Sequence, residues 1–287
     1  MTSPIAHVSD TARWVAMYRA LESERPDALF HDPHARRLAG AGGEHILRTL
    51  PKARQFAWPM IVRTAVMDEI ILRAVERDGV DTVLNLASGL DARPYRLPLP
   101  SSVRWFEADF PAMLDYKEEQ LRGERPGCHL ELLRVDLADP AARRNALARA
   151  MAGARSALVI TEGLLVYLER DQVMDLARDL HAQPAIRFWL TDIAMPRLLK
   201  MMEKNWGRHL QAGNARMRFA PAEGTAFFAP LGWREIEFRS NWEEAFRLRR
   251  TMRFGKLWRF LGRFYPKRIQ EEFRRFAGMV LLERSSS

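Results

Sequence analysis

Three carboxylates of this 287-residue chain each stand at the end of a short apolar run: Asp109 (run 102–109), Asp136 (130–136) and Glu162 (157–162). If these runs are strands of one open α/β sheet, their carboxyl ends meet at the edge where such sheets bind ligands. Three negative charges around one crevice disfavour a polyphosphate. They favour a cation, or a ligand rich in hydrogen-bond donors.

Each acid also has a purely structural interpretation. Asp109 could cap a helix that begins at Pro111, and Asp136 could be a turn residue before residues 137–140. Glu162 could lie at a helix N-terminus, where the helix dipole favours a negative charge. Their shared position at the ends of successive strands favours a ligand site over these alternatives.

The first predicted turn of this kind lies in "VLNLASGLDARPYRL", residues 83–97, and holds one glycine, Gly89. The dinucleotide fingerprint has three glycines, which serve a pyrophosphate. Asp109 follows Gly89 by twenty residues, about the spacing at which an acid binds ribose hydroxyls. S-adenosylmethionine fits this pattern because it has a ribose, an adenine and a positive centre but no phosphate. Asp136 would then accept a hydrogen bond from the adenine amino group, with Leu137 against the ring.

Two more positions complete this hypothesis. Gly89 has no Cβ, so the amino-acid tail of the ligand could approach the backbone closely. Arg63, on a helix predicted within residues 60–79, could hold the tail's carboxylate with its forked guanidinium. The alternative is that Arg63 is a surface arginine on an amphipathic helix.

The elements that must position these residues alternate along the chain. Strands are predicted at residues 81–87, 102–109, 130–136, 157–162, 186–193, 233–238 and 278–284, with helices between them that include 139–151 and 170–181. This pattern is typical of an α/β fold, a mostly parallel seven-stranded sheet covered by helices on both faces. We expect one domain over 1–287, with a helical N-terminal cap (1–80), a cofactor-binding core (81–193), a helical lid insertion (194–230) and the final strands with a basic helical segment (231–287).

Composition restricts the classes of protein further. A single cysteine, Cys128, excludes an internal disulfide and fits a reducing compartment. No signal-peptide pattern and no run of about 20 apolar residues is present, so a soluble, cytoplasmic protein is expected. The seven histidines are scattered and none has a metal-ligand spacing, so we expect no metal site.

A basic segment, residues 247–275, carries eleven basic and two acidic residues, a difference of 11 − 2 = 9 that equals the net charge of +9. Aromatic residues are interleaved with the cations. This combination could contact an anionic membrane surface or a nucleic acid. It could also be a solvated helix face whose arginine stems cover apolar surface, the interpretation we favour because no nucleic-acid motif accompanies it.

Several stretches together resemble the leucine carboxyl methyltransferase family of class I S-adenosylmethionine-dependent methyltransferases, which includes bacterial polyketide carboxyl O-methyltransferases. The matching stretches are residues 14–40, 62–71, 83–97, 105–117, 135–140 and 161–168, and the resemblance is weakest from about 195 to 230. The resemblance implies a Rossmann-like fold and S-adenosylmethionine as cofactor.

The resemblance also implies which residues contact the cofactor: Arg63, Gly89, Asp109, Asp136, Leu137 and Glu162. Asp91 and Arg93 match a loop element that we expect to brace the loop rather than touch the cofactor. Ser88 stands where many relatives have a second glycine, and it could either tighten the loop or contact the cofactor.

The implied reaction is transfer of a methyl group to an oxygen, in which catalysis is mainly alignment, so no catalytic acid or base is assigned. A carboxylate acceptor with a pKa of about 4 is ionised at neutral pH, whereas a phenol with a pKa of about 10 would profit from a base. We therefore expect methyl-ester formation on a small molecule such as a polyketide-type compound of secondary metabolism. A hydroxyl acceptor, a nucleic-acid or membrane-surface binder, and a non-catalytic cofactor-binding protein are the alternatives; the oligomeric state stays open.

The acceptor pocket is expected between the N-terminal helices and residues 194–230. Tyr167, Arg197 and Trp206 are the candidate acceptor contacts, and an arginine would suit an anionic acceptor. The methionine and aromatic residues nearby suit an adaptable apolar pocket, although each could equally be part of the core.

Overall fold

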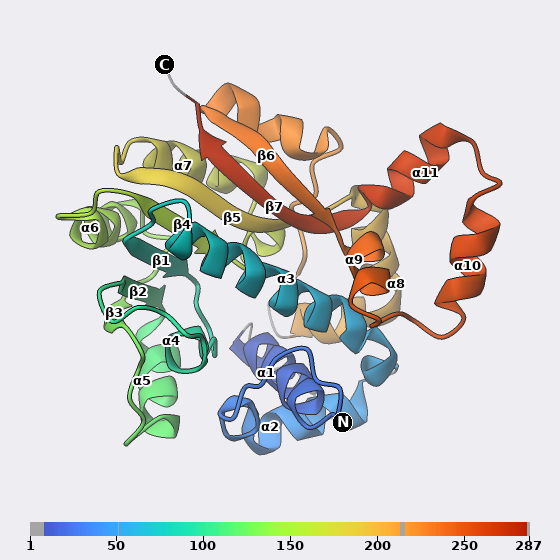
Figure 1. The fold of residues 1–287 in the computed structure, drawn as a ribbon, viewed down its shortest axis with the longest axis horizontal. Helices are drawn as coiled ribbons and strands as arrows, with labels where there is room; N and C mark the ends of the chain where they lie inside the picture. The colour runs from blue at the N-terminus through green and yellow to red at the C-terminus, as the bar shows by residue number, and fades with distance from the viewer. Residues whose placement is uncertain (1–8, 51, 213–215, 286–287) are drawn as a thin grey trace.

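A computed structural model describes residues 9–50, 52–212 and 216–285 of the chain. Its centre is a seven-stranded sheet with the order β3-β2-β1-β4-β5-β7-β6 (Figure 1). The strands are β1 (Thr82–Leu86), β2 (Arg104–Asp109), β3 (His129–Arg134), β4 (Ala157–Thr161), β5 (Ile186–Ala194), β6 (Trp233–Ser240) and β7 (Ala277–Arg284). The first five are parallel, and β7 is antiparallel to both β5 and β6. The predicted α/β fold is confirmed.

Helices cover both faces of the sheet. Successive residues of a strand point to opposite faces, so each strand packs against both layers of helices. Leu84 packs in one cluster with side chains of α6 (Pro140–Met151) and α7 (Arg170–His181). Val83 packs in another with α3 (Ala57–Glu76). Both faces are therefore dry, as expected for parallel strands. The short helices α4 (Arg93–Arg96), α5 (Pro111–Gln120), η2 (Leu165–Tyr167) and α9 (Asn241–Arg247) complete the layers.

The N-terminal part packs as a separate helical cluster beside the sheet. It consists of α1 (Ser9–Ser23), α2 (Ala35–Thr49) and η1 (Ala53–Phe56), packed on the first part of α3. Trp14 and Tyr18 are buried in this cluster. Residues 1–8 of the expected cap lie outside the described residues.

The chain after β5 is largely helical, as predicted. It forms α8 (Pro196–Ala212) and η3 (Gly224–Leu231), and residues 213–215 between them lie outside the described residues. Between β6 and β7 the chain forms α9, then α10 (Gly255–Gly262) and α11 (Lys267–Arg274), which stand away from the body at the right of Figure 1. We call residues 252–274 the arm. No helix in the described ranges is long and apolar enough to cross a membrane.

Candidate active site

A cavity of about 2380 Å³ opens at the carboxyl ends of β1, β2, β4 and β5 and continues to the arm. The strand order reverses at this point: β2 follows β1 on one side of the sheet, and β5 follows β4 on the other side. Open α/β sheets bind ligands at such a reversal. All seven predicted cofactor-binding residues line the cavity: Arg63, Ser88, Gly89, Asp109, Asp136, Leu137 and Glu162.

The turn after β1 has an unusual backbone. Ala87 (φ 52°) and Gly89 (φ 51°) are both left-handed, a conformation that glycine adopts without strain and alanine does not. A Cβ at Gly89 would lie 3.2 Å from the Cβ of Ala12 on α1. Gly89 is thus required by its own backbone and by the helix above it, and the N-terminal cluster closes directly over this loop.

Asp109, at the end of β2, fixes the same turn. Its Oδ2 accepts a hydrogen bond from the Gly89 N–H (2.6 Å) and its Oδ1 accepts one from the Phe110 N–H (2.7 Å). It does not cap α5, whose N-cap is Phe110 without a side-chain bond, so the capping interpretation is wrong. Burial raises the pKa of Asp109, and the two N–H groups partly oppose this. An ionised carboxylate offers about four lone pairs, so two remain for a ligand.

Asp136 differs from Asp109 in its surroundings. It is exposed at the edge of the cavity, and its Oδ1 accepts the Ala138 N–H at 2.8 Å, so it does form the turn that the structural alternative predicted. Leu137 beside it is half-buried. Both residues line the cavity, and the turn leaves the second carboxylate oxygen of Asp136 for a donor.

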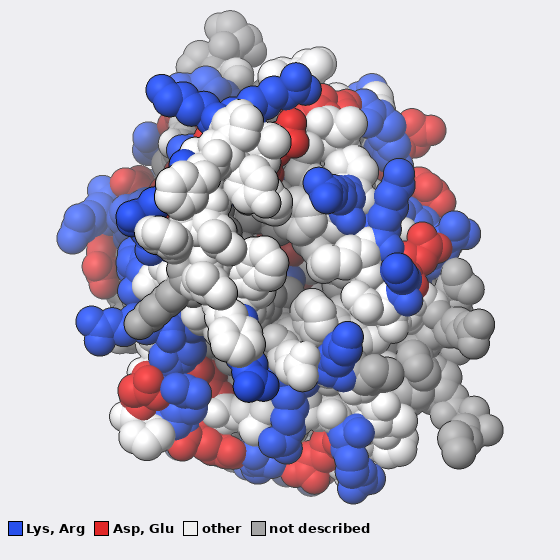
Figure 2. Space-filling model, turned by 90° about the vertical axis from the view of Figure 1, so that its right-hand side faces the viewer, with Lys and Arg blue, Asp and Glu red and all other residues white. Residues whose placement is uncertain are grey.

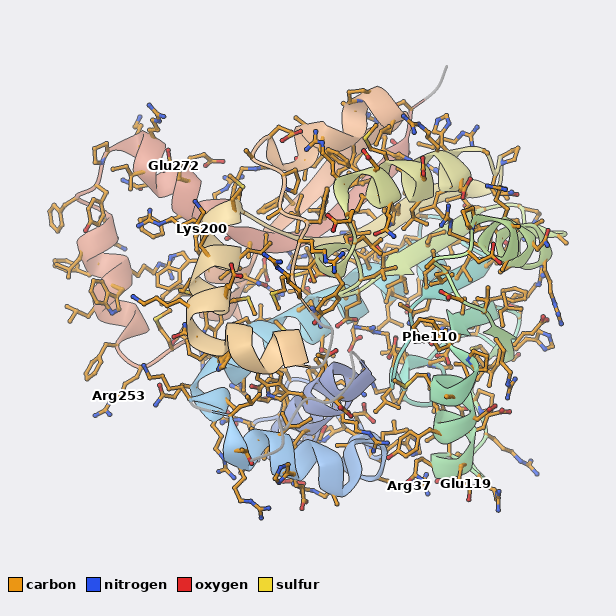
Figure 3. All side chains as sticks on the ribbon, turned by 180° about the vertical axis from the view of Figure 1, so that it is seen from behind. Arg37, Phe110, Glu119, Lys200, Arg253 and Glu272 are labelled. Carbon is orange, nitrogen blue, oxygen red and sulfur yellow. The ribbon has the colours of Figure 1, made fainter. Side chains whose placement is uncertain are left out.

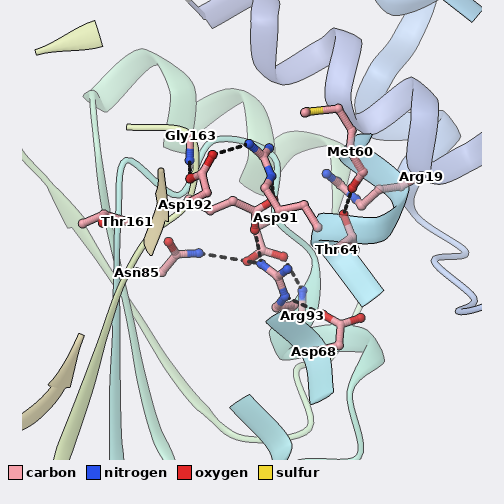
Figure 4. A network of polar contacts seen from close by, with 12 residues as sticks. Arg19, Met60, Thr64, Asp68, Asn85, Asp91, Arg93, Thr161, Gly163 and Asp192 are labelled. Carbon is pink, nitrogen blue, oxygen red and sulfur yellow. Dashed lines mark hydrogen bonds and ion pairs between the residues drawn. The ribbon is translucent and has the colours of Figure 1, made fainter. Parts of the chain in front are cut away.

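The deepest part of the site is an ion-pair network between α3 and the strand ends (Figure 4). Arg63 donates from Nε to Glu162 Oε1 at 2.9 Å and from Nη1 to Asp192 Oδ2 at 3.0 Å. Glu162 accepts a further bond on Oε2 from Arg93 Nη1 at 2.7 Å. Burial would raise the pKa of Glu162, but Arg93 and Arg63 outweigh burial and lower it, so the carboxylate is ionised.

Arg93 joins this network to the loop. It is 2% exposed and donates to Asp68 (2.6 Å) and to Asp91 (2.8 Å). Asp91 also accepts from Asn85 Nδ2 at 2.9 Å and from the Arg93 N–H at 3.0 Å. Asp91 and Arg93 therefore brace the loop, the arrangement expected for the "D-x-R" element.

Ser88 is buried in the cavity lining, and its Oγ makes no hydrogen bond with a described residue. A buried hydroxyl without a partner is costly, so this atom suits a ligand contact.

Asp192 is a residue of the site that was not predicted from the sequence. Its Oδ1 accepts the Gly163 N–H at 2.6 Å while its Oδ2 accepts from Arg63, so it links the ends of β4 and β5. The signal was available, because Asp192 stands near the end of a predicted strand, like the three acids that were identified.

The predicted acceptor contacts separate into two groups. Tyr167 and Trp206 line the cavity, and Trp206 packs edge-to-face on Trp14 and Phe56, with ring centroids 5.4 and 4.9 Å apart. Burial raises the pKa of Tyr167, so it is protonated at neutral pH. Arg197 lies on an exposed part of α8 and is not among the described residues that line the cavity, so the structure corrects its expected position.

No cluster of three or more potential metal-ligating His, Cys, Asp or Glu side chains occurs among the described residues. The ion-pair network contains five acids and four arginines, an excess of 5 − 4 = 1 acid: Asp32, Asp68, Asp91, Glu162 and Asp192 against Arg19, Arg63, Arg93 and Arg96. With Asp109 nearby, the site is suited to a ligand that carries positive charge.

Comparisons with known proteins agree with this geometry. Residues 12–181 match the family model for leucine carboxyl methyltransferases. A candidate S-adenosyl-L-methionine-dependent methyltransferase of Streptomyces coelicolor is 40% identical over 57% of this chain and 60% of its own length. A similar candidate of Mycobacteroides abscessus is 38% identical over 57% of this chain and 56% of its own length. The chain thus spans less than two thirds of the length of these relatives.

Two solved structures share the fold. A DUF574 family protein of Streptomyces avermitilis has a TM-score of 0.62 with 14% identity, covering 99% of both chains. A candidate methyltransferase of Thermobifida fusca has a TM-score of 0.54 with 15% identity, covering 94% of this chain and 95% of its own. With the family model matching more than half of its residues, the chain belongs to the leucine carboxyl methyltransferase family.

Proposed function

We propose that the protein is an S-adenosylmethionine-dependent O-methyltransferase that forms a methyl ester on a small-molecule carboxylate. The observation that carries this proposal is the hydrogen bond between Asp109 and the loop glycine, Gly89, at the carboxyl ends of β1 and β2. It supports the proposal because Asp109, which could accept hydrogen bonds from ribose hydroxyls, lies beside a loop with one glycine rather than the three that serve a pyrophosphate. The relatives named as S-adenosyl-L-methionine-dependent methyltransferases support the choice of cofactor.

The residues present fit this cofactor. Asp109 would accept hydrogen bonds from the ribose hydroxyls, and Asp136 from the adenine amino group, with Leu137 against the ring. The unpartnered Ser88 Oγ would complete a contact at the loop. When bound, S-adenosylmethionine supplies an activated methyl group.

The ion-pair network would hold the amino-acid end of the cofactor. Two nitrogens of Arg63 are engaged by Glu162 and Asp192, and Nη2 makes no hydrogen bond with a described residue, which leaves it for a carboxylate. Glu162 then acts mainly by orienting Arg63, and the excess of acids suits an ammonium or sulfonium group. This refines the direct contact that the family resemblance implied for Glu162.

The acceptor side supports a carboxylate more than a phenol. Tyr167 is protonated because burial raises its pKa, so it donates a hydrogen bond to the acceptor and does not serve as the base that a phenol requires. Trp206 and Met202 of α8 line this side of the cavity, which fits the proposal that residues 194–230 form a lid over the acceptor. Cys128 is buried and free, which fits the cytoplasm as the proposed location.

The test is incubation of the full chain with methyl-labelled S-adenosylmethionine and an extract of its source cells. We expect a labelled small molecule that releases its label as methanol in mild base, because esters are cleaved there and ethers are not. A base-stable product would favour the hydroxyl alternative. A chain that fails to bind S-adenosylmethionine in calorimetry would contradict the proposal as a whole.

A further inference from the structure

The arm concentrates the exposed apolar surface of the molecule. Nine of the twelve exposed large apolar side chains in the described part of the chain belong to it: Met252, Phe254, Leu257, Trp258, Phe260, Leu261, Phe264, Tyr265 and Phe273. Such a patch on a protein surface marks an interaction site. α10 and α11 are seen from behind as a column at the left of Figure 3, with Arg253 and Glu272 labelled near its two ends.

Exposed apolar side chains form a stripe along α10 and the residues that flank it. Phe254, Leu257, Leu261 and Phe264 follow one another at intervals of three and four residues and are 64, 54, 43 and 75% exposed. Leu257 and Leu261 share one face of α10, whereas Phe254 is its N-cap residue, with a left-handed backbone (φ 62°), and Phe264 lies in the turn that follows the helix. None of the four lines the cavity, whereas Trp258, Arg259 and Arg263 of the same segment do. If the arm closed onto the body, it would bury the second group and leave the stripe in water.

The cations of the basic segment fall into two sets. At the base of the arm, Arg247, Arg250 and Arg275 pair with Glu69, Glu22 and Glu235 of the body, so these three have a structural role. Within the arm, the cations that form no ion pair with a described residue are Arg253, Arg259, Arg263 and Lys267. Lys and Arg border an uncharged ridge beside a hollow in Figure 2, which looks onto this face.

We propose that the arm docks onto an anionic lipid surface, with the stripe of α10 in the acyl region and the unpaired cations beside lipid phosphates. Interleaved aromatic and basic residues on a short amphipathic helix are typical of such contacts. A second copy of the chain fits less well, because two arms of the same charge would repel each other. A nucleic acid also fits less well, since two of the four stripe residues, Leu257 and Leu261, have no ring that could stack on bases.

Docking would bring the arm's side of the cavity to the lipid, because the exposed Trp258 and Tyr265 of the arm are among the residues that line the cavity. An apolar acceptor could then pass from the bilayer into the cavity without crossing water. The docking itself does not depend on methyl transfer, so it can be measured without an identified acceptor.

The experiment is co-sedimentation of the full chain with vesicles of phosphatidylcholine containing about one third phosphatidylglycerol, and with pure phosphatidylcholine vesicles. We expect binding to the anionic vesicles that is about tenfold stronger than to the neutral ones and that falls with salt. The triple variant Phe254→Ser, Leu257→Ser, Phe264→Ser is expected to lose at least about tenfold in affinity. Ile236→Ser, an exposed apolar residue of β6 outside the cavity, is the matched control and should bind like the unaltered chain.

Circular dichroism and cofactor calorimetry on each variant show whether the body has kept its fold. Equal vesicle binding by the triple variant and the unaltered chain would overturn the proposal. So would an unaltered chain that binds neither vesicle, whether it then binds a single-stranded oligonucleotide or self-associates in sedimentation velocity. Loss of cofactor binding with intact vesicle binding would instead count against the proposed function alone.

Discussion

Arginine serves opposite purposes in the crevice and in the arm. Arg93 in the crevice is 2% exposed and is held by the carboxylates of Asp68, Asp91 and Glu162 at 2.6 to 2.8 Å. Arg263 in the arm is exposed and forms no ion pair with a described residue. A buried charge must stay paired because its dehydration is costly, so it fixes geometry. A hydrated, unpaired charge fixes nothing within the fold and remains available to a partner.

The largest effect is expected from removing the central guanidinium. Arg93→Met leaves three acids of the crevice without their common partner, which should lower the free energy of unfolding by about 3–5 kcal/mol. The matched control is Arg155→Met, whose side chain is 88% exposed and pairs with Asp81, and which should cost less than about 1 kcal/mol. Urea unfolding measures both. Equal losses in the two variants would remove the distinction between buried and exposed arginines drawn above.

A smaller effect, on binding, is expected at Asp109. Asp109→Asn removes the charge and one acceptor, so affinity for S-adenosylmethionine should fall about tenfold to a hundredfold, or roughly 1.5–3 kcal/mol. Asp115→Asn on α5, an exposed acid paired with Arg134, is the control and should bind normally. Calorimetry with a parallel unfolding curve separates binding from stability. An Asp109→Asn chain that folds and binds the cofactor normally would show that the crevice is assigned to the wrong residues.

A third test concerns pH and a buried pair between β2 and α5. Glu107 accepts a hydrogen bond from Lys117 Nζ at 2.6 Å, and burial raises its pKa from 4.5 to about 7, although Lys117 opposes the shift. Between pH 4.5 and about 7, Glu107 is protonated in the folded chain but ionised in the unfolded chain. The contribution of Glu107 to stability is therefore fully present below pH 4.5 and is lost as the pH rises through about 7.

Urea unfolding at about pH 5 and about pH 8 measures this contribution. The unaltered chain should lose more stability between the two pH values than Glu107→Gln does. Only the slopes are compared, because the variant also leaves Lys117 without its carboxylate. Parallel slopes would mean that Glu107 is ionised throughout this pH range.

The smallest effect is expected in the arm. Arg263→Ala should change the free energy of unfolding by no more than about 0.5 kcal/mol, because it removes no internal contact. Arg250→Ala, at the base of the arm, breaks a buried pair with Glu22 at 2.8 Å and should cost clearly more. If Arg263→Ala destabilises the chain as much as Arg250→Ala, the arm is part of the packed body.

The strands and their acids could be predicted from the sequence because both are local signals. The run at residues 81–87 became β1 (Thr82–Leu86), and the acid that ends the run at 102–109 is the one that holds Gly89. The partners of Arg63 could not be predicted in the same way. Glu162 and Asp192 lie 99 and 129 residues further along the chain, and spacing does not encode which carboxylate faces which guanidinium.

The position of Arg197 could not be predicted from its residue type. An arginine suits an anionic acceptor, but Arg197 lies on an exposed part of α8 that does not line the cavity. The cavity is lined from α8 by Leu198, Leu199, Met201, Met202 and Trp206, but not by Arg197. Met201 lies one helical turn after Arg197 and does line the cavity, so neither residue type nor helical periodicity alone predicts which side chains reach it.

The position of β7 sets an order of assembly. Among the seven strands of the described residues it is synthesised last, yet it lies inside the sheet, between β5 and β6. β6 is made earlier but pairs only with β7, so it has no strand partner while the arm is being synthesised. Until then the edge of β5 is an open template for pairing with another chain. The finished protein therefore owes the closure of this edge to residues 277–284, and nascent chains stopped before them would expose it to aggregation.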